Sequence, residues 1–402
     1  MVLTPPKATH KQTKTYNQQL VFKTIYDHGT ISRAEVARLT DLTRVTVSEI
    51  VADLLERGLV AEVGRGPSAG GKSPILLSVV DDAYHMIGVD VAGDELCGAV
   101  LNLRGVVRAS LNRPLPSDDG TQALSKVYEL LDHLVSQAER PLLGIGVGTP
   151  GLLDTTKGVV KRAVNLGWVD LPLGALLETR YKLPVYVAND SQVTALAENI
   201  FGGGVGEVNL AVIRVGRGIG AGIILNRQLF QGDGFGAGEV GHISIVEHGE
   251  VCRCGNTGCV ETVGSTSAIL RRGRALAPSH PDSMLNRLVA SPDFLTLEQM
   301  HEAFQAGDAL ASQIILEAGR AVGFAVACLI SVLNVKKILL AGSAARFGVP
   351  WLEAVRVEAA QRALAALGLE AEITFGELEE DAVILGASAL LLTQELGLSL
   401  VR

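Results

Sequence analysis

The chain has 402 residues, of which 48% are hydrophobic and 45 are glycine, and its formal net charge is −8. This length is too great for one ordinary domain, and the composition excludes a disordered or fibrous chain and favours a globular protein with large buried sheets. No uninterrupted apolar run reaches the roughly 20 residues of a membrane span, and the polar, basic start is unlike a signal peptide. We therefore expect a cytoplasmic protein with no membrane contact and with reduced cysteines.

Charge is divided unevenly between a short head and a long body. Residues 1–80 carry ten Lys and Arg against seven Asp and Glu, a net charge of +3, so the rest of the chain carries −11. A small basic segment joined to an acidic body is typical of a DNA-binding module attached to another domain. Lys7, Lys11 and Lys14 form a basic N-terminal arm that either contacts phosphates or is a solvated tail.

Three helices are predicted in the head. Helical spacing of apolar residues over 17–31 predicts the first, ended by Gly29. Ser32, with Glu35 three residues later, predicts a capped second helix over 33–39. A third is expected from Thr43 to 57, and its buried stripe is Val45, Val47, Ile50, Val51, Leu54 and Leu55. A short helix, a three-residue turn and a longer helix make a helix-turn-helix.

A hairpin is expected to follow the helices. Residues 59–63 alternate like a strand, 74–79 can pair with them, and a flexible basic loop lies between. The head is therefore predicted to be a winged helix-turn-helix that binds DNA. The expected DNA contacts are Arg33, Thr43, Arg44, Thr46, Ser48, Arg65 and Lys72. A helical protein-interaction domain without a DNA role is the alternative.

From Met86 onward the pattern changes to α/β. Strands are predicted over 87–91, 96–103, 106–111, 143–148 and 185–188, with helices over 122–138 and 191–201. A second round follows, with strands over 209–215, 222–225 and 337–340, helices after Ser265 and a closing helix from Asp381. Two similar halves with a cleft between them suggest a duplicated, actin-like architecture.

Three glycine-bearing turns follow strands of these halves. They lie at Asp90–Asp94, at Gly216–Gly222 and at Ala341–Ser343. Such turns let backbone amides approach phosphates, but a tight hairpin is the better explanation for any single one.

Three of the five cysteines cluster behind one histidine. Cys252, Cys254 and Cys259 follow His242 in a glycine-rich stretch, bracketed by Glu239 and Glu261. Three thiolates and one imidazole are the full ligand set of a closed, structural zinc site, with no position open for water. Unlinked surface cysteines are the alternative, and a redox pair lacks the required CxxC spacing.

Asp190 is the best candidate for a general base. It ends a buried strand beside Asn189, whose amide can orient a hydroxyl. Glu239, His242 and Glu261 would add hydrogen-bonding groups for a polyol. The alternative is that Asp190 only caps the helix that follows.

Together these residues resemble the ROK family, which contains sugar-responsive repressors and sugar kinases on an actin-like, ribonuclease H-like fold. The most specific element is Glu239-x-Gly-His242 with Cys252-x-Cys254-Gly-x-x-Gly-Cys259-x-Glu261, and the resemblance covers essentially the whole chain. It implies zinc ligands at His242, Cys252, Cys254 and Cys259. It implies sugar contacts at Asn165, Asn189, Asp190, Glu239, His242 and Glu261, with Asp190 as catalytic base in kinase members.

One departure from the family pattern bears on function. Kinase members carry Asp-x-Gly-Gly-Thr after the first strand, whereas this chain reads Asp90-Val-Ala92-Gly93-Asp94. Ala92 adds a Cβ where phosphate must come close, and Asp94 would repel it by roughly 1–4 kcal/mol. We therefore expect ATP and Mg²⁺ to bind weakly or not at all, and a vestigial nucleotide site at Asp90, Gly93, Gly218, Gly220 and Gly342.

The expected function is a sugar-responsive transcriptional repressor, active as a homodimer or homotetramer on a pseudo-palindromic operator. The expected domains are a head over 1–80, a first lobe over 81–200 to which residues 381–402 return, and a second lobe over 201–380. An ATP-dependent sugar kinase with a DNA-binding head is the first alternative, and a protein-binding scaffold the second.

Overall fold

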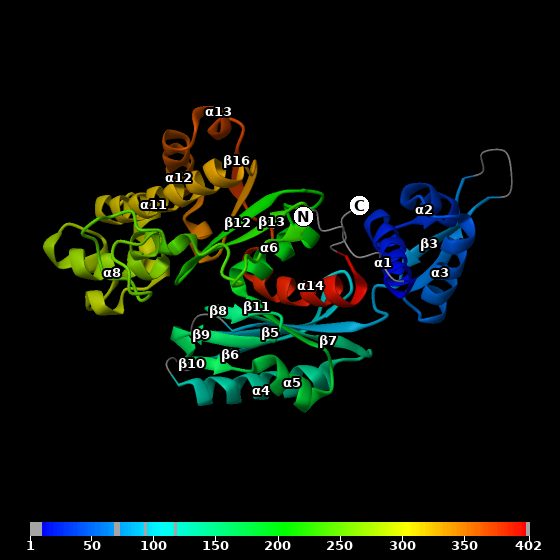
Figure 1. Cartoon of the computed structure of the whole chain (residues 1–402). Coiled ribbons are helices and arrows are strands. Elements are labelled where there is room, and N and C mark those ends of the chain that lie inside the picture. Colours follow the sequence, from blue (N-terminus) through cyan, green and yellow to red (C-terminus); the bar gives the residue numbers. More distant parts are fainter. Residues whose placement is uncertain (1–9, 68–72, 92–94, 116–118, 399–402) are drawn as a thin grey trace, which may run out of the picture.

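The computed structural model describes residues 10–67, 73–91, 95–115 and 119–398. In chain order it consists of a helical head with a small sheet and two lobes, each built on a five-stranded sheet (Figure 1). This arrangement confirms the predicted winged head on a duplicated α/β body.

The head is a three-helix unit with a β-hairpin wing. Its elements are α1 (His10–His28), β1 (Ile31–Ser32), α2 (Arg33–Thr40), α3 (Arg44–Glu56), β2 (Val60–Arg65) and β3 (Ile75–Val79). The Ser32 hydroxyl accepts from the Glu35 amide, and the Glu35 carboxylate accepts from the Ser32 amide, so the predicted capping box is present. The hairpin pairs β2 with β3, and β1 adds a third strand that the sequence did not predict.

Two details of the head differ from expectation. Helix α1 begins at His10 rather than 17, so Lys14 lies on a helix and not on an extended arm, while Lys7 lies outside the described residues. Val45 is 68% exposed although it was assigned to the buried stripe of α3. It precedes the buried Val47 by two residues, about 200° around the helix, and therefore faces away from the core.

The first lobe is a mixed sheet in the order β11-β7-β4-β5-β6. Its strands are β4 (His85–Asp90), β5 (Glu95–Asn102), β6 (Val107–Pro114), β7 (Leu142–Thr149) and β11 (Val185–Asn189). Strands β4, β5 and β6 form an antiparallel meander, and β7 and β11 run parallel to β4. Helices α4 (Gly120–Gln137) and α5 (Leu173–Tyr181) cover one face with a continuous apolar core.

The second lobe repeats this order as β14-β13-β12-β15-β16. Its strands are β12 (Leu210–Val215), β13 (Ile219–Leu225), β14 (Gln228–Leu229), β15 (Lys337–Ala341) and β16 (Glu372–Phe375). The helices of this lobe are α7 (Val260–Gly264), α8 (Thr266–Leu276), α9 (Leu285–Leu288), α10 (Leu297–Gln305), α11 (Ala309–Leu333), α12 (Gly348–Arg362) and α13 (Ala365–Gly368). The same strand order and directions in both sheets confirm the duplication.

Several elements of the body went unpredicted. A meander of β8 (Leu152–Asp154), β9 (Val159–Ala163) and β10 (Trp168–Leu171) projects from the first lobe. Strand β13 begins at Ile219, three residues before the expected strand, so Gly220 lies in the strand with Gly222 rather than in a turn. Both glycines face α6, where a Cβ at Gly222 would lie 2.4 Å from the Ala195 Cβ.

Helix α11 is long and apolar enough by length and composition to span a membrane. This helix was not foreseen as a candidate span, because Glu317 and Arg320 interrupt its apolar run. In its most apolar window 67% of the residues are buried inside the protein, where they pack between β12 and α12. It is the central core helix of the second lobe.

Two helices, α6 (Asp190–Phe201) and α14 (Ala382–Leu396), lie between the two sheets. Helix α14 comes from the C-terminal end of the chain and packs on β4 and β7 of the first lobe (Figure 1). The packing is close because glycines face the helix: a Cβ built on Gly146 would lie 1.8 Å from the Ala387 carbonyl oxygen, and one on Gly88 would lie 2.2 Å from that of Ile384.

The head packs directly against the body next to α14 (Figure 1). One buried apolar cluster, which we call the head–body cluster, contains residues of α1, the wing, the first sheet and the end of α14. Its members include Val21, Phe22, Ile25, Tyr26, Leu77, Met86, Leu103, Leu391, Leu392 and Leu396. The Tyr26 hydroxyl also donates to the Leu103 carbonyl at 2.8 Å.

Candidate functional site

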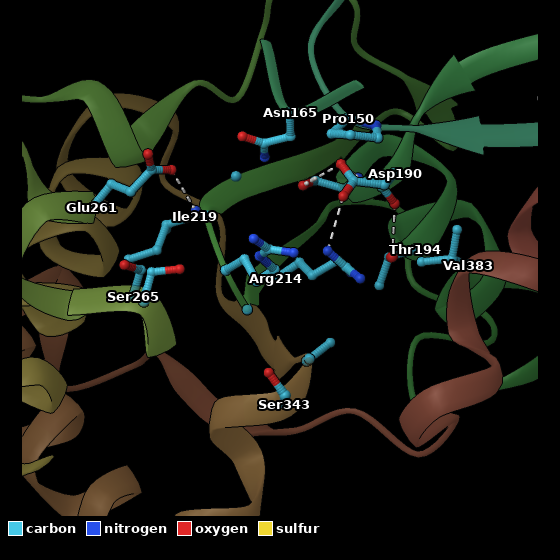
Figure 2. Close-up of a pocket in the computed structure, with 18 of the residues that line it drawn as sticks. Pro150, Asn165, Asp190, Thr194, Arg214, Ile219, Glu261, Ser265, Ser343 and Val383 are labelled. Atoms are coloured by element: carbon cyan, nitrogen blue, oxygen red, sulfur yellow. Dashed lines mark hydrogen bonds and ion pairs between the residues drawn. The ribbon is translucent and has the colours of Figure 1, made fainter. Parts of the chain in front are cut away.

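A cleft of about 2070 Å³ lies between the two lobes, where strands of both sheets end (Figure 2). The residues that the sequence assigned to sugar binding all line it, although they come from three separate stretches of chain. They are Asn165, Asn189, Asp190, Glu239, His242 and Glu261.

Asp190 is a buried acid of the cleft that two neighbouring groups hold in place. It is the first residue of α6, directly after β11, and is buried. Its Oδ1 accepts from the Ser191 amide at 2.8 Å, and its Oδ2 accepts from Nη1 of Arg214 at 2.8 Å. The sequence reasoning missed Arg214, although a single arginine inside the apolar strand Leu210–Val215 was a usable signal.

Asn189, rather than Asp190, caps helix α6. Its Oδ1 accepts from the amides of Ser191 at 2.9 Å and Gln192 at 3.4 Å, and its Nδ2 donates to the Gly151 carbonyl at 3.1 Å. The capping explanation for Asp190 is therefore wrong. Asn189 holds the cleft wall in shape, and Asp190 is left to face the cleft.

Three further polar groups surround the opposite wall. The Glu261 carboxylate accepts from the Ile219 amide at 2.9 Å, which fixes it against the hairpin of the second sheet. Glu239 lies 3.6 Å from Nε2 of His242. Burial raises the pKa of Glu239; the nearby His242 opposes this, while the charges of Asp190 and Glu261 add to it. The acids of the cleft thus lie close enough to interact.

The predicted metal ligands come together at the edge of the cleft. One ligand atom from each of His242, Cys252, Cys254 and Cys259 lies within 4.8 Å of all the others. Nδ1 of His242 is 3.6 Å from Sγ of Cys252, and the sulfurs of Cys254 and Cys259 are 3.7 Å apart. In a tetrahedral zinc site with bonds of about 2.3 Å the sulfurs would be about 3.8 Å apart, so the cluster fits a metal ion of this kind.

His242 connects the metal cluster to the cleft. Its Nδ1 faces the cysteines, and its Nε2 points to Glu239. A second link was not predicted: Arg253, between two of the cysteines, donates to Oδ1 of Asn165 at 2.5 Å. Asn165 lies in the first lobe, so this bond joins the lobes across the cleft. An arginine between two such cysteines belongs to no recognisable motif.

The expected nucleotide residues lie in the same cleft, apart from Gly93, which, with Ala92 and Asp94, lies outside the described residues. Asp90 ends β4, and Gly342, with φ +89°, follows β15. Gly216 to Gly218 form the turn of the β12–β13 hairpin, in which the Gly216 amide donates to the Gly218 carbonyl. Gly220 packs on Ser191 instead of lying in the expected glycine-bearing turn.

Most of the predicted DNA contacts among the described residues lie on α3, at its N-cap or on the wing. Arg44 and Ser48 are exposed on α3, and Arg65 is exposed at the end of the wing strand β2. Thr43 is the N-cap of α3, and its hydroxyl accepts from the Thr46 amide at 3.1 Å. Arg33 is bound to Glu62 at 2.8 Å, and Lys72 lies outside the described residues.

Known proteins that are similar to this chain match its head as well as its two-lobed body. The model of the ROK family matches residues 86–394. The xylose repressor of Caldicellulosiruptor bescii is 33% identical over 394 residues, covering 96% of this chain and 98% of that protein.

Two solved structures extend the comparison. A ROK family transcriptional regulator, described as a homologue of the Escherichia coli MLC protein, has a TM-score of 0.84 at 26% identity and covers 96% of this chain and 98% of its own. A ROK family glucokinase from Streptomyces griseus, solved with glucose and AMPPNP, has a TM-score of 0.69 at 26% identity and covers 76% of this chain and 98% of its own.

Proposed function

The chain belongs to the ROK family, and we propose that it is a sugar-responsive transcriptional repressor. The observation that carries the proposal is the similarity of nearly the whole chain, head included, to a xylose repressor. The glucokinase, by contrast, matches 76% of this chain, less than the repressor relatives do. A winged head packed on a two-lobed body unites DNA binding and ligand binding in one molecule.

In this proposal the sugar binds in the cleft through carboxylate, amide and imidazole groups. Asp190, Glu239 and Glu261 accept from sugar hydroxyls, His242 hydrogen-bonds through Nε2, and Asn165 and Asn189 complete the set. Such a group of fixed acceptors suits a polyol, because each hydroxyl can donate to a carboxylate.

We propose that His242, Cys252, Cys254 and Cys259 hold a structural Zn²⁺. Bound there, zinc would supply a cross-link that fixes the loop carrying the cysteines. His242 and Glu261 flank this loop, so their positions in the cleft depend on it. The set offers no open position for a catalytic water.

The head, assigned to residues 1–80, would bind operator DNA with α3 in the major groove and the wing on the backbone. Arg44, Thr46 and Ser48 would face base edges, while Arg33, Thr43, Arg65 and Lys72 would position the head on phosphates. We assign the lobes to 81–200 with 381–402, and to 201–380. A cytoplasmic homodimer or homotetramer would match the two-fold symmetry of an operator.

An ATP-dependent sugar kinase is the second candidate, favoured by the match to the glucokinase fold and by the place of Asp190 in the cleft. The test is a thermal-shift panel of xylose, glucose and N-acetylglucosamine, with and without Mg-ATP, on the zinc-loaded protein. A repressor gives a stabilising shift with one sugar and forms no ADP. ADP formed with that sugar would establish the kinase, and no response to any sugar would favour a scaffold.

A further inference from the structure

Arg214 and Asp190 form an ion pair that crosses the cleft. Arg214 lies near the end of β12 in the second sheet, and Asp190 follows β11 in the first. Figure 2 shows the two side chains pointing toward one another, with Nη1 and Oδ2 2.8 Å apart. Only 22% of the Arg214 side chain and 11% of the Asp190 side chain are exposed, so water screens the pair weakly.

A second carboxylate belongs to the same group. Asp90 ends β4 and lines the cleft together with Arg214 and Asp190. Burial lowers the pKa of Arg214, but the charges of Asp190 and Asp90 outweigh it and raise this pKa. The guanidinium therefore faces Asp190 of the other lobe directly, and Asp90 lies in the same cleft.

Both oxygens of Asp190 are committed in this arrangement. Oδ1 accepts from the Ser191 amide and Oδ2 accepts from Arg214. Each oxygen keeps a lone pair and can still accept from a sugar hydroxyl. As a general base, however, Asp190 would have to accept the substrate proton on an oxygen that already accepts from Ser191 or Arg214.

A phosphoryl-transfer site requires a different occupant at this place. Kinases of sugars and proteins hold Mg²⁺ between phosphate oxygens and carboxylates close to the accepting hydroxyl. Here a guanidinium already pairs with Asp190 from within the chain. An anionic ligand would gain little, because it would meet Asp90 and Asp190 together with Arg214.

We propose that Arg214 is a positioning and specificity-determining residue that acts as a resident cation. It takes the place of a divalent ion beside Asp190 and holds Asp190 as a hydrogen-bond acceptor for sugar. The sugar part of this inference rests on the proposed function, whereas the cation part does not.

The test compares full-length, zinc-loaded wild type with Arg214→Ala by thermal melting in the presence and absence of millimolar MgCl₂. We expect the melting temperature of the variant, and not that of the wild type, to rise with Mg²⁺, because the ion replaces the lost charge. Sugar affinity in the variant should fall at least tenfold. Arg214→Lys restores a cation and should remove the Mg²⁺ response and recover most of the sugar affinity.

Arg346→Ala is the matched control. This arginine lines the same cleft but pairs with an exposed carboxylate, that of Glu380, at 3.7 Å. The melting temperature of this variant should not rise with Mg²⁺. If Arg214→Ala does not fold, Arg214→Gln keeps most of the side-chain volume and takes its place in the same measurement.

The inference is overturned if a charge-removing variant at Arg214 shows no stabilisation by Mg²⁺, or if Mg²⁺ stabilises wild type and Arg214→Lys as much as it stabilises that variant. Unchanged sugar affinity in that variant would equally remove the positioning role. If wild type binds no sugar of the panel, the proposed function fails, but the Mg²⁺ comparison still decides whether Arg214 acts as a resident cation.

Discussion

At the scale of single residues, the cleft depends on side chains that do two tasks. His242 faces the metal cluster with Nδ1 and Glu239 with Nε2, and Asn189 both caps α6 and supports the Gly151 loop. A substitution at such a position has effects at a distance from the atom that is removed.

Cys254→Ser should lose the metal ion and, with it, most of the sugar affinity. Cys254 is not one of the proposed sugar contacts, so the loss would come from the loop that places His242 and Glu261. Metal analysis and a sugar titration on the same sample measure both effects. Cys328→Ser, in α11 and outside the cluster, is the control. Full sugar affinity in a metal-free Cys254→Ser protein would refute the tethering role.

Arg44→Ala should weaken operator binding by about 1–3 kcal/mol and leave sugar binding unchanged. Arg44 opens α3 and is exposed, as a base-reading side chain must be. The measurement is a binding isotherm at constant salt on DNA selected by the wild-type protein from a random pool. Arg57→Ala changes the same charge at the other end of α3, about 20 Å away, and should have a small effect. Equal losses in both variants would mean that α3 does not read the operator.

At the scale of elements, α14 is the helix that connects the cleft to the head. Its first residues, Ala382 and Val383, line the cleft, and its last turns enter the head–body cluster through Leu391, Leu392 and Leu396. At 15 residues it is about 22 Å long. It is held on the first sheet by contacts that only glycine permits.

Gly146→Ala should therefore destabilise the protein by about 3 kcal/mol, because its Cβ would overlap the backbone of α14 at Ala387. Chemical unfolding followed by circular dichroism measures the loss. Gly234→Ala, where an added Cβ meets nothing within 4 Å, should change the unfolding free energy by less than about 0.5 kcal/mol. Similar stabilities for the two variants would show that α14 can shift to accept the methyl group.

The sequence predicted those elements whose signals are local. The capping box at Ser32, the Asn189–Asp190 step and the histidine–cysteine pattern are short motifs, and the structure places each of them at the expected element or in the cleft. The sequence did not predict Gly220 as a strand residue. The residue type alone does not distinguish a glycine that packs on a neighbouring helix from a glycine in a loop. The Arg214–Asp190 pair joins two sheets, and no local pattern reveals its partner.

At the scale of the whole molecule, direct contacts join the head to the body, and they give a change in the cleft a physical route to the DNA-binding head. Besides the apolar cluster, Arg104 donates to the Tyr26 carbonyl at 2.9 Å and to Asp81 at 3.1 Å, and its guanidinium lies 3.9 Å from the centre of the Tyr26 ring. These contacts tie α1 to the first sheet.

Arg104→Ala should leave the separate affinities for sugar and operator nearly unchanged while weakening their coupling. Coupling free energies between sites are typically about 1–3 kcal/mol, and we expect most of this to disappear. Operator titrations with and without saturating sugar measure it. Arg108→Ala, which breaks an exposed pair with Asp82 instead, should keep the coupling. An undiminished sugar effect in Arg104→Ala would place the route elsewhere.

The head–body cluster also has a consequence for the DNA itself. A head on a flexible tether would tolerate half-sites at many separations, whereas a head buried against its own body is a fixed arm. In any two-fold assembly of this chain, the fixed positions of the two heads then determine the distance between the half-sites that the protein can bind. Adding five base pairs between the half-sites, about half a helical turn, should turn one half-site to the far side of the duplex. One head of the assembly would then lose its DNA contact and its contribution to the binding free energy.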